Sequence, residues 1–323
     1  MSALQRPLRQ RIAAAELRGV EQRVADAVVG VVLQVHRAYV EVQHAQQSLE
    51  LSQTVAAATA ASAGAARAIR DAGNLPAYAV ASEEAMAAQS VADVVDADVS
   101  LSMARAELGR LLGAGAADTS WTIADRLGDP LAEQWTLNTL DSLAITRRLD
   151  VSAALESAQA AFSTVGLANR FRLLPDGTIG GFIEREPDGR FAGGNASIPL
   201  PILDGGGARV AKARAMLEKR VAEHDALVVD VHAAVRTAWA RYEGARRRAV
   251  QLSTSVLPAR RRVLVESQLQ VNALAMPVFA LLQAKQAEID AAHMYLDALR
   301  DYWSARAELE RATGGMLPAR SGP

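Results

Sequence analysis

The chain contains two copies of one segment, and this duplication constrains the fold more than any other feature of the sequence. Residues 104–113 (ARAELGRLLG) align with residues 305–314 (ARAELERATG) at an offset of 201, and seven of the ten positions are identical. Farther upstream, VHRAY at 35–39 aligns with VRTAW at 235–239. A repeat of this length is a supersecondary unit used twice. We therefore interpret residues 15–113 and 208–314 as structural copies.

Both copies carry apolar residues at alternating spacings of four and three. A period of 3.5 keeps one seam of a helix against a neighbouring helix, as in a coiled coil. Small residues dominate this seam, so the helices can approach closely. The first seam is Val24, Val28, Val31, Val35, Ala38, Val42, Ala45, Leu49 and Ser52, and the second is Val228, Val231, Val235, Ala238, Tyr242, Ala245, Ala249, Leu252 and Val256.

The first helix should run from about residue 15 to 71, which at about 1.5 Å per residue gives a length of about 85 Å. A helix-stopping glycine then precedes a proline suited to a first helical turn, so the chain should reverse into a second helix ending near residues 112–113. The second copy should reverse before Pro277, and Pro258 should kink its incoming helix. The two reversals contain Gly73, Asn74, Leu75 and Pro76, and Asn272, Ala273, Leu274 and Met276.

A different pattern separates the two copies. Residues 116–138 form a mixed connector with Trp121 and Trp135, and a helical stretch from about 140 to 169 follows. Residues 173–186 and 195–200 read as strands around a turn at 187–190, and alternation is expected of strands between lipid and water. The residues expected in this membrane hairpin are Ile179, Phe182, Ile183, Ala196, Ile198 and Leu200.

The predicted fold is therefore mainly α: two long antiparallel helical hairpins, as internal repeats, plus one β-hairpin. We divide the chain into a first helical hairpin repeat (1–115), a connector with short helices (116–171), a β-hairpin (172–203), a second helical hairpin repeat (204–316) and a disordered tail (317–323).

Composition argues against several functional classes. The formal charge of −1 and pI near 6.5 leave no basic excess for nucleic acid. Two histidine pairs, His36 with His44 and His224 with His232, are spaced by eight residues, too far along a helix to share a metal. The three glycines 205–207 lack the lysine and serine of a phosphate loop and read as a structural joint. We expect no enzyme activity, cofactor or metal.

The repeated glutamates, Glu107 and Glu308, have arginines beside them in the sequence. We expect each to form ion pairs on the surface of its own helix.

The junction at residues 198–213 (IPLPILDGGGARVAKA), the motif RLDVSAA at 148–154 and the order of the elements resemble the TolC family of outer-membrane efflux proteins, and LRDYW at 299–303 is similar to its heavy-metal efflux branch. The resemblance implies a homotrimer with a shared outer-membrane barrel and a periplasmic tunnel. It also implies a periplasmic adaptor bound at the helix reversals and an inner-membrane pump. Relative to that family, the signal peptide, first ascending helix and first β-hairpin are absent, so we expect an N-terminally truncated form.

A soluble coiled-coil scaffold is the alternative function, and an enzyme is a distant third. Residues 173–202 discriminate the first two, because a scaffold has no use for a strand pair with alternating faces.

Overall fold

A computed structural model describes residues 5–114, 121, 123, 125–131, 135–173, 178–186, 189–197, 205–273, 275–315 and 317. The chain is mainly helical with one antiparallel β-hairpin, which confirms the predicted fold class. It divides into two compact units. Unit 1 comprises Met1–Val29, Asn138–Val235 and Ala312–Gly315, and unit 2 comprises Gly30–Leu137, Arg236–Arg311 and Met316–Pro323. Of the predicted tail 317–323, only Leu317 lies within the described residues.

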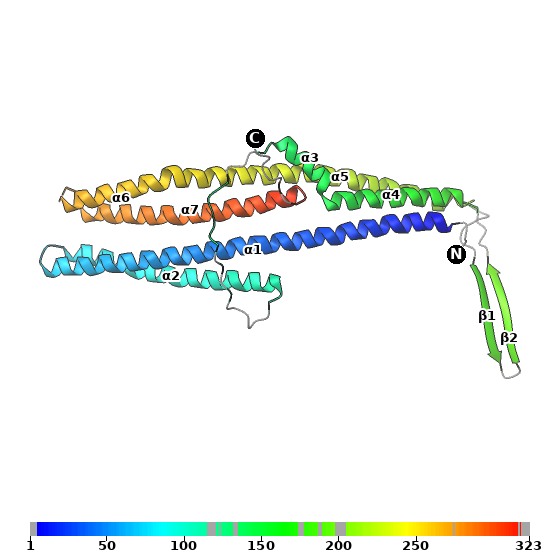
Figure 1. Ribbon diagram of the computed structural model, residues 1–323, viewed down its shortest axis with the longest axis horizontal. Helices are drawn as coiled ribbons and strands as arrows, with labels where there is room; N and C mark the ends of the chain where they lie inside the picture. Colours follow the sequence, from blue (N-terminus) through cyan, green and yellow to red (C-terminus); the bar gives the residue numbers. More distant parts are fainter. Residues whose placement is uncertain are drawn as a thin grey trace. The chain divides into compact units, whose positions relative to one another are not determined.

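Unit 2 contains two antiparallel helical hairpins (Figure 1). In the first, the later part of α1 (Arg6–Asp71) lies against α2 (Ala77–Leu112). In the second, the end of α5 (Gly207–Gln251) continues into α6 (Leu257–Asn272), which lies against α7 (Val278–Ala312). The predicted long helices and both reversals are thus present. α1 begins at Arg6 instead of near residue 15, because proline at its second position is compatible with a first helical turn.

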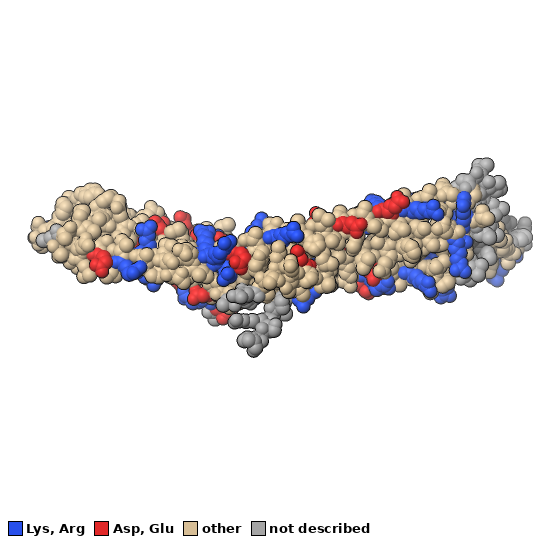
Figure 2. All heavy atoms as spheres, turned by 90° about the horizontal axis from the view of Figure 1, so that it is seen from above, with Lys and Arg blue, Asp and Glu red and all other residues tan. Residues whose placement is uncertain are grey.

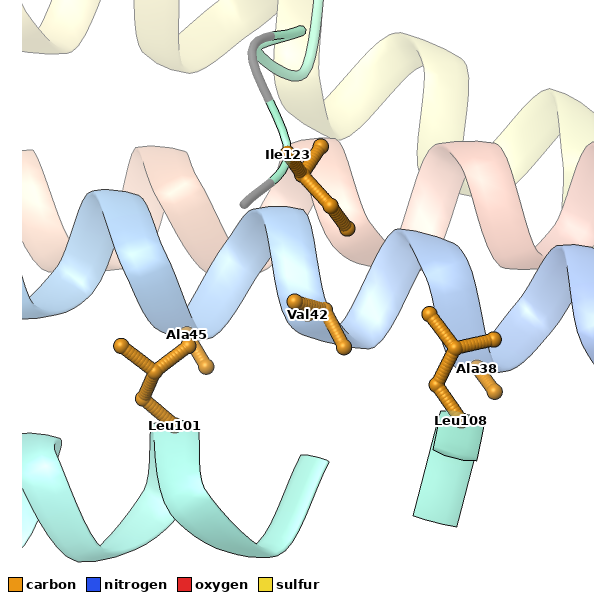
Figure 3. Packing of buried hydrophobic residues seen from close by; sticks show 6 residues of the cluster. All are labelled: Ala38, Val42, Ala45, Leu101, Leu108 and Ile123. Atoms are coloured by element: carbon orange, nitrogen blue, oxygen red, sulfur yellow. The ribbon is translucent and has the colours of Figure 1, made fainter. Parts of the chain in front are cut away.

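The core of the first hairpin is built from small and branched side chains of the predicted seam. Figure 3 shows Val42 of α1 between Leu101 and Leu108, which point toward it from α2. Ile123 of the connector packs on the same cluster from the other side of α1. In the second hairpin, the equivalent seam residue Tyr242 is also fully buried. The 3.5-residue period therefore marks real helix contacts in unit 2.

The first turns of the α1 seam differ from the prediction. Val24, Val28 and Val31 are 60%, 57% and 50% exposed, whereas Val42, farther along the seam, is fully buried. The apolar pattern continues from Val24 through Val42, but in a single chain no described segment covers the side chains of Val24, Val28 and Val31. An apolar stripe therefore remains on the surface of α1.

A π-helical turn, Leu252–Val256, separates α5 from α6 directly before Pro258, where an interruption was predicted. Proline has no N–H to donate to the preceding turn, and its ring crowds the carbonyl four residues earlier. The N–H of Leu257 instead reaches the carbonyl of Leu252, five residues back. The extra residue in this turn accommodates the proline without ending the helical path.

Aromatic side chains fix the described part of the connector to unit 2. The Trp135 ring lies 5.6 Å from the Tyr242 ring. The backbone N–H of Leu131 donates to the Tyr302 hydroxyl at 3.1 Å, and Trp303 Nε1 donates to the carbonyl of Gly128 at 2.9 Å. The carbonyl of Asp125 also accepts a hydrogen bond from Gln43 Nε2 of α1 at 3.2 Å. An irregular segment without secondary structure of its own thus obtains hydrogen bonds from both helical hairpins.

The helix predicted over residues 140–169 is in fact two helices, α3 (Leu137–Arg147) and α4 (Leu149–Arg170). Arg148 between them has an extended backbone, with φ −67° and ψ 124°. Its guanidinium pairs with Asp150 at 2.5 Å and donates to the carbonyl of Ala312 at 3.4 Å. A contact made 164 residues away therefore accompanies the break, and helical periodicity alone does not reveal it.

The β-hairpin consists of β1 (Thr178–Glu186) and β2 (Gly189–Ser197), paired antiparallel. β1 begins five residues later than predicted. β2 begins six residues earlier than predicted. Arg190, which was expected in the turn, lies in β2 opposite Arg185 in the strand register. Glycine-rich β2 has little strand propensity, so its pairing with β1 determines where it begins. Ile198 and Leu200, two of the predicted membrane residues, lie outside the described residues, as do residues 187 and 188 of the predicted turn.

Candidate interaction sites

The two helix reversals of unit 2 are the first candidate sites. After α1, Gly73 adopts φ 81°, and the N–H of Asn74 donates to the carbonyl of Ile69 at 3.1 Å. After α6, the N–H of Ala275 donates to the carbonyl of Gln270 at 2.9 Å. Both bonds span five residues and close a helix C-terminus with the same geometry. Of the predicted tip residues, Leu274 lies outside the described residues.

The repeat offset of 201 residues extends through both reversals. Pro76 and Pro277 occupy equivalent positions before α2 and α7, and the carbonyl of each accepts a bond from the residue three positions later. Leu75 and Met276 are equivalent and both are half-buried, whereas Gly73, Asn74, Asn272 and Ala273 are exposed. In Figure 1 the two reversals lie at the same end of unit 2. The described tip residues thus lie at one end of this unit. Their role in binding stays a prediction.

Two aromatic side chains that the sequence prediction missed flank these reversals. Tyr78 in the first turn of α2 is 64% exposed, and Phe279 in the first turn of α7 is 51% exposed. They are also 201 residues apart. Only 4% of the residues are aromatic, so two exposed rings at equivalent positions are notable. Applying the repeat offset to the aromatic residues would have found the pair.

A buried polar cluster lies deeper between the hairpins of unit 2. Lys285 Nζ of α7 donates to Ser62 Oγ of α1 at 2.7 Å and pairs with Glu83 Oε1 of α2 at 3.2 Å. Glu83 is only 5% exposed. Beside the cluster is an open groove of about 600 Å³ lined mainly by apolar side chains of α1, α6 and α7. One ammonium group thus links the second hairpin to both helices of the first.

A half-buried histidine forms a second link between the hairpins. His44 Nε2 lies 3.0 Å from Asp297 Oδ1. Burial lowers the pKa of His44 below its ordinary value, and the charge of Arg300 lowers it further, while Asp297 and Glu41 oppose the shift. The imidazole is therefore neutral at neutral pH, and the contact is a hydrogen bond from Nε2–H and not an ion pair.

The described β-hairpin contains four of the six predicted membrane residues, Ile179, Phe182, Ile183 and Ala196. Phe182 and Ile183 are 51% and 81% exposed. They are consecutive in β1, so their side chains leave opposite faces. Phe182 lies over Gly193 of the paired strand, where any added Cβ would lie 2.5 Å from the ring. Ile183 shares its face with Ala196, which is exposed, and Ile179 is the register partner of Ala196.

The glycines 205–207 act as the predicted structural joint. Gly205 and Gly206 have φ values of 55° and 75° immediately before α5. A Cβ on Gly206 would lie 2.3 Å from the carbonyl oxygen of Arg172, so the backbones approach too closely for any side chain.

The described residues contain no group of three or more acidic, histidine or cysteine side chains placed to hold a metal. None of the described helices combines the length and hydropathy needed to cross a lipid bilayer.

Comparison with known proteins identifies the fold. The structure of a membrane protein from Pseudomonas aeruginosa matches with a TM-score of 0.81 and 19% sequence identity, over 97% of this chain and 75% of that one. The outer membrane protein VceC from Vibrio cholerae matches with a TM-score of 0.78 and 17% identity, over 94% and 74%. The outer membrane channel MtrE from Neisseria gonorrhoeae, in its open state, gives 0.75 and 20% identity, over 95% and 71%.

Sequence comparison adds no closer assignment: no protein-family model matches the chain, and no curated protein is significantly similar to it. The resemblance to the heavy-metal efflux branch stays a prediction. The described helical hairpins and β-hairpin, together with these matches, give the chain the TolC-like fold of outer-membrane channels.

Proposed function

We propose that the chain is the channel subunit of an outer-membrane efflux assembly, in which three copies surround a water-filled conduit for small molecules or metal ions. The observation that carries this proposal is the match of 94% or more of the chain to the solved outer membrane protein VceC and the outer membrane channel MtrE. The conduit is passive, and its opening is a shift in packing between the helical hairpins. An inner-membrane pump supplies the energy through a periplasmic adaptor.

Exposed apolar stripes support assembly with sister copies. Eight leucine and valine side chains, 45% to 60% exposed, recur at spacings of three and four on α1 and α2. Apolar patches of this kind mark interaction surfaces. The coiled-coil period fits a second helix of the same kind. The eight residues are Leu17, Val20, Val24, Val28 and Val31 of α1, and Val91, Val95 and Val99 of α2.

The oligomeric state tests this part of the proposal. The purified chain should have the mass of a trimer in light scattering coupled to size exclusion, in mild detergent. Val95→Glu should yield monomers because it places a charge in an apolar contact. Ser102→Glu, at an exposed polar position of the same helix, is the matched control and should remain trimeric. A monomeric wild type, or a trimeric Val95→Glu variant, would contradict the proposal.

We assign the adaptor contact to the helix reversals and their flanking rings, Tyr78 and Phe279. Aromatic residues supply much of the binding energy in protein interfaces. Changing both to serine should weaken binding of the adaptor by about 30-fold or more. Phe162→Ser, which removes a 68% exposed ring from α4, is the control. Binding is measured by interferometry on immobilised adaptor. If the Tyr78 and Phe279 double variant and the Phe162→Ser control weakened binding equally, the helix reversals would not be the adaptor contact.

The β-hairpin supports a membrane channel over the soluble coiled-coil scaffold. Ile183 and Phe182 expose large apolar surfaces on a paired strand, which a scaffold would not need. The discriminating measurement is single-channel conductance after reconstitution in planar bilayers. A channel gives stepwise currents that disappear in Ile183→Asp, whereas a scaffold gives none in either form.

A further inference from the structure

Unit 1 contains a groove with an apolar floor and a cationic rim. Its volume is about 330 Å³. Its apolar lining residues, called the floor below, come from α4, the residue after it and α5, and Gln5 and Thr164 also line the groove. The floor residues are Leu167, Ala168, Phe171, Ala213 and Met216. At the rim are Arg9 from α1 and Arg209 and Lys212 from α5. None of these residues belongs to the sites described above.

The three helix ends that form this groove are rich in positive charge. Residues 5–15, 157–173 and 205–217 contain eight cations, and the nearest acidic residues along these helices are Glu16, Glu156 and Glu218. Figure 2 shows several Lys and Arg side chains, in blue, near the right-hand end of the view, with Asp and Glu side chains, in red, farther from that end. Asp176 and Asp204, in the segments that link these helix ends to the β-hairpin, lie outside the described residues. The eight cations are Arg6, Arg9, Arg11, Arg170, Arg172, Arg209, Lys212 and Arg214.

Hydrogen bonds orient two of the rim cations, Arg9 and Arg209. Arg9 Nε and Nη2 donate to Gln5 Oε1 at 3.1 and 2.7 Å. Arg209 Nη2 donates to the carbonyls of Phe171 and Arg172 at 2.9 and 2.8 Å. Arg172 Nε donates to the carbonyl of Gly205 at 2.6 Å. These bonds join the C-terminus of α4 to the start of α5 across the base of the β-hairpin. The guanidinium of Arg209 is thus oriented by the fold, through hydrogen bonds to two neutral carbonyl groups.

We propose that this groove binds an anionic phospholipid, with the phosphate headgroup at Arg9, Arg209 and Lys212 and the start of an acyl chain along the apolar floor. Arginine and lysine are the side chains that suit phosphate oxygens. The combination of an apolar floor with a cationic edge fits an anionic amphiphile better than a free anion, which would leave the floor exposed to water.

The position of the groove relative to a membrane rests on the proposed function. Arg170 precedes β1 by eight residues, and Gly207 follows β2 by ten. Even a fully extended chain of eight residues reaches only about 28 Å. If the hairpin enters the bilayer, the groove therefore lies within reach of the lipid headgroups.

Binding to vesicles tests the proposal with the full chain. The chain contains no cysteine, so Met216→Cys gives a single site for an environment-sensitive dye on the groove floor. The dye emission should shift to the blue with vesicles of phosphatidylcholine and phosphatidylglycerol, and much less with phosphatidylcholine alone. In flotation of the unlabelled chain, Lys212→Gln should weaken binding to the anionic vesicles about fivefold. The triple variant Arg9→Gln, Arg209→Gln, Lys212→Gln should weaken it by on the order of 100-fold.

Arg260→Gln with Arg262→Gln, which removes two exposed cations from α6, is the control for charge and should not weaken binding. The single variant Lys212→Gln keeps the test valid if the triple variant misfolds, because the Lys212 side chain is exposed and its replacement should leave the fold intact. Equal binding to neutral and anionic vesicles, or equal weakening in the control, would overturn the proposal. A chain that forms no trimer and no conductance can still show this lipid preference, so the two failures are distinguishable.

Discussion

Glu308 of α7 accepts a hydrogen bond from Arg241 of α5 at 3.1 Å, and its other carboxylate oxygen pairs with Arg37 of α1. One partly buried carboxylate thus connects three helices of unit 2. Its repeat counterpart, Glu107, pairs instead with Arg110 on its own helix at 2.6 Å. The same residue in the two copies therefore has a tertiary role in one and a local role in the other.

This difference predicts unequal effects of the same substitution. Glu308→Gln should lower the free energy of unfolding of unit 2 by about 1 kcal/mol, because it weakens two ion pairs that are only partly screened by water. Glu107→Gln should have no measurable effect, since its pair is fully exposed. Urea unfolding followed by circular dichroism measures both. Equal destabilisation by the two variants would contradict the assigned roles.

The contrast between Glu107 and Glu308 also shows what the sequence could and could not predict. Repeat offset and 3.5-residue period located the long helices, both reversals and the buried seam around Val42, because these depend on local order along one chain. The partners of Glu308 and the break at Arg148 depend on residues far away in sequence, and no spacing rule identifies them. The exposed seam at Val24 looks identical in sequence to the buried one, since a pattern records the need for a partner and not which segment supplies it.

The candidate sites show the same difference between residues with a local sequence signature and residues without one. Gly73 and Pro76 are recognisable because a helix reversal needs those backbone conformations. Tyr78 and Phe279 were missed because an exposed ring has no local signature. The cationic groove of unit 1 combines three basic segments whose charge is balanced by acidic residues elsewhere in the chain, so the net charge of −1 conceals it.

The cluster of Lys285, Glu83 and Ser62 predicts that the stability of unit 2 depends strongly on the pairing of Lys285 with Glu83. Glu83→Leu alone should destabilise unit 2 by about 3 kcal/mol, because it leaves a largely buried ammonium without its carboxylate. Adding Lys285→Met should restore most of this loss, since an apolar pair of similar volume removes both desolvation costs. A double-mutant cycle from chemical denaturation measures the coupling. Losses that simply add in the double variant would show that the pair does not act as a unit.

His44 predicts a pH dependence of stability. Its pKa is lowered in the folded chain from an ordinary value of 6.5, so below that value the unfolded chain binds more protons. Stability should therefore be complete above about pH 7 and should decline as the pH falls toward the lower, folded-state pKa. The groups that face His44 are Asp297, Arg300 and Glu41. The carboxylates of Asp297 and Glu41 raise the pKa of His44 and so moderate the decline, whereas Arg300 strengthens it.

Comparison of His44→Gln with wild type tests this dependence, using thermal unfolding at a series of pH values between about 7 and 5. The variant should show a flatter slope, because it no longer excludes a proton on folding. His36→Gln, at an exposed position on the same helix, is the matched control. An unchanged slope in His44→Gln would mean that other groups cause the acid sensitivity.

The repeat provides a final test at its two closing glycines. Gly113 and Gly314 have similar left-handed φ values of 69° and 83°. A Cβ on Gly113 meets nothing within 4 Å, whereas one on Gly314 would lie 2.9 Å from the backbone of Arg147 and Arg148. Gly113→Ala should therefore cost only the left-handed conformation, about 1 kcal/mol. Gly314→Ala should cost more, because the alanine must also displace the junction between α3 and α4.

Hydrogen exchange separates the two effects. In Gly314→Ala, amide protons of α3 and the first turn of α4 should exchange faster, because Arg148 loses its fixed position against the end of α7. In Gly113→Ala, faster exchange should be confined to the last turn of α2. If both variants changed exchange only locally and to the same extent, the packing of Gly314 against Arg147 would contribute nothing to the break between α3 and α4, and the ion pair of Arg148 with Asp150 would be its sufficient cause.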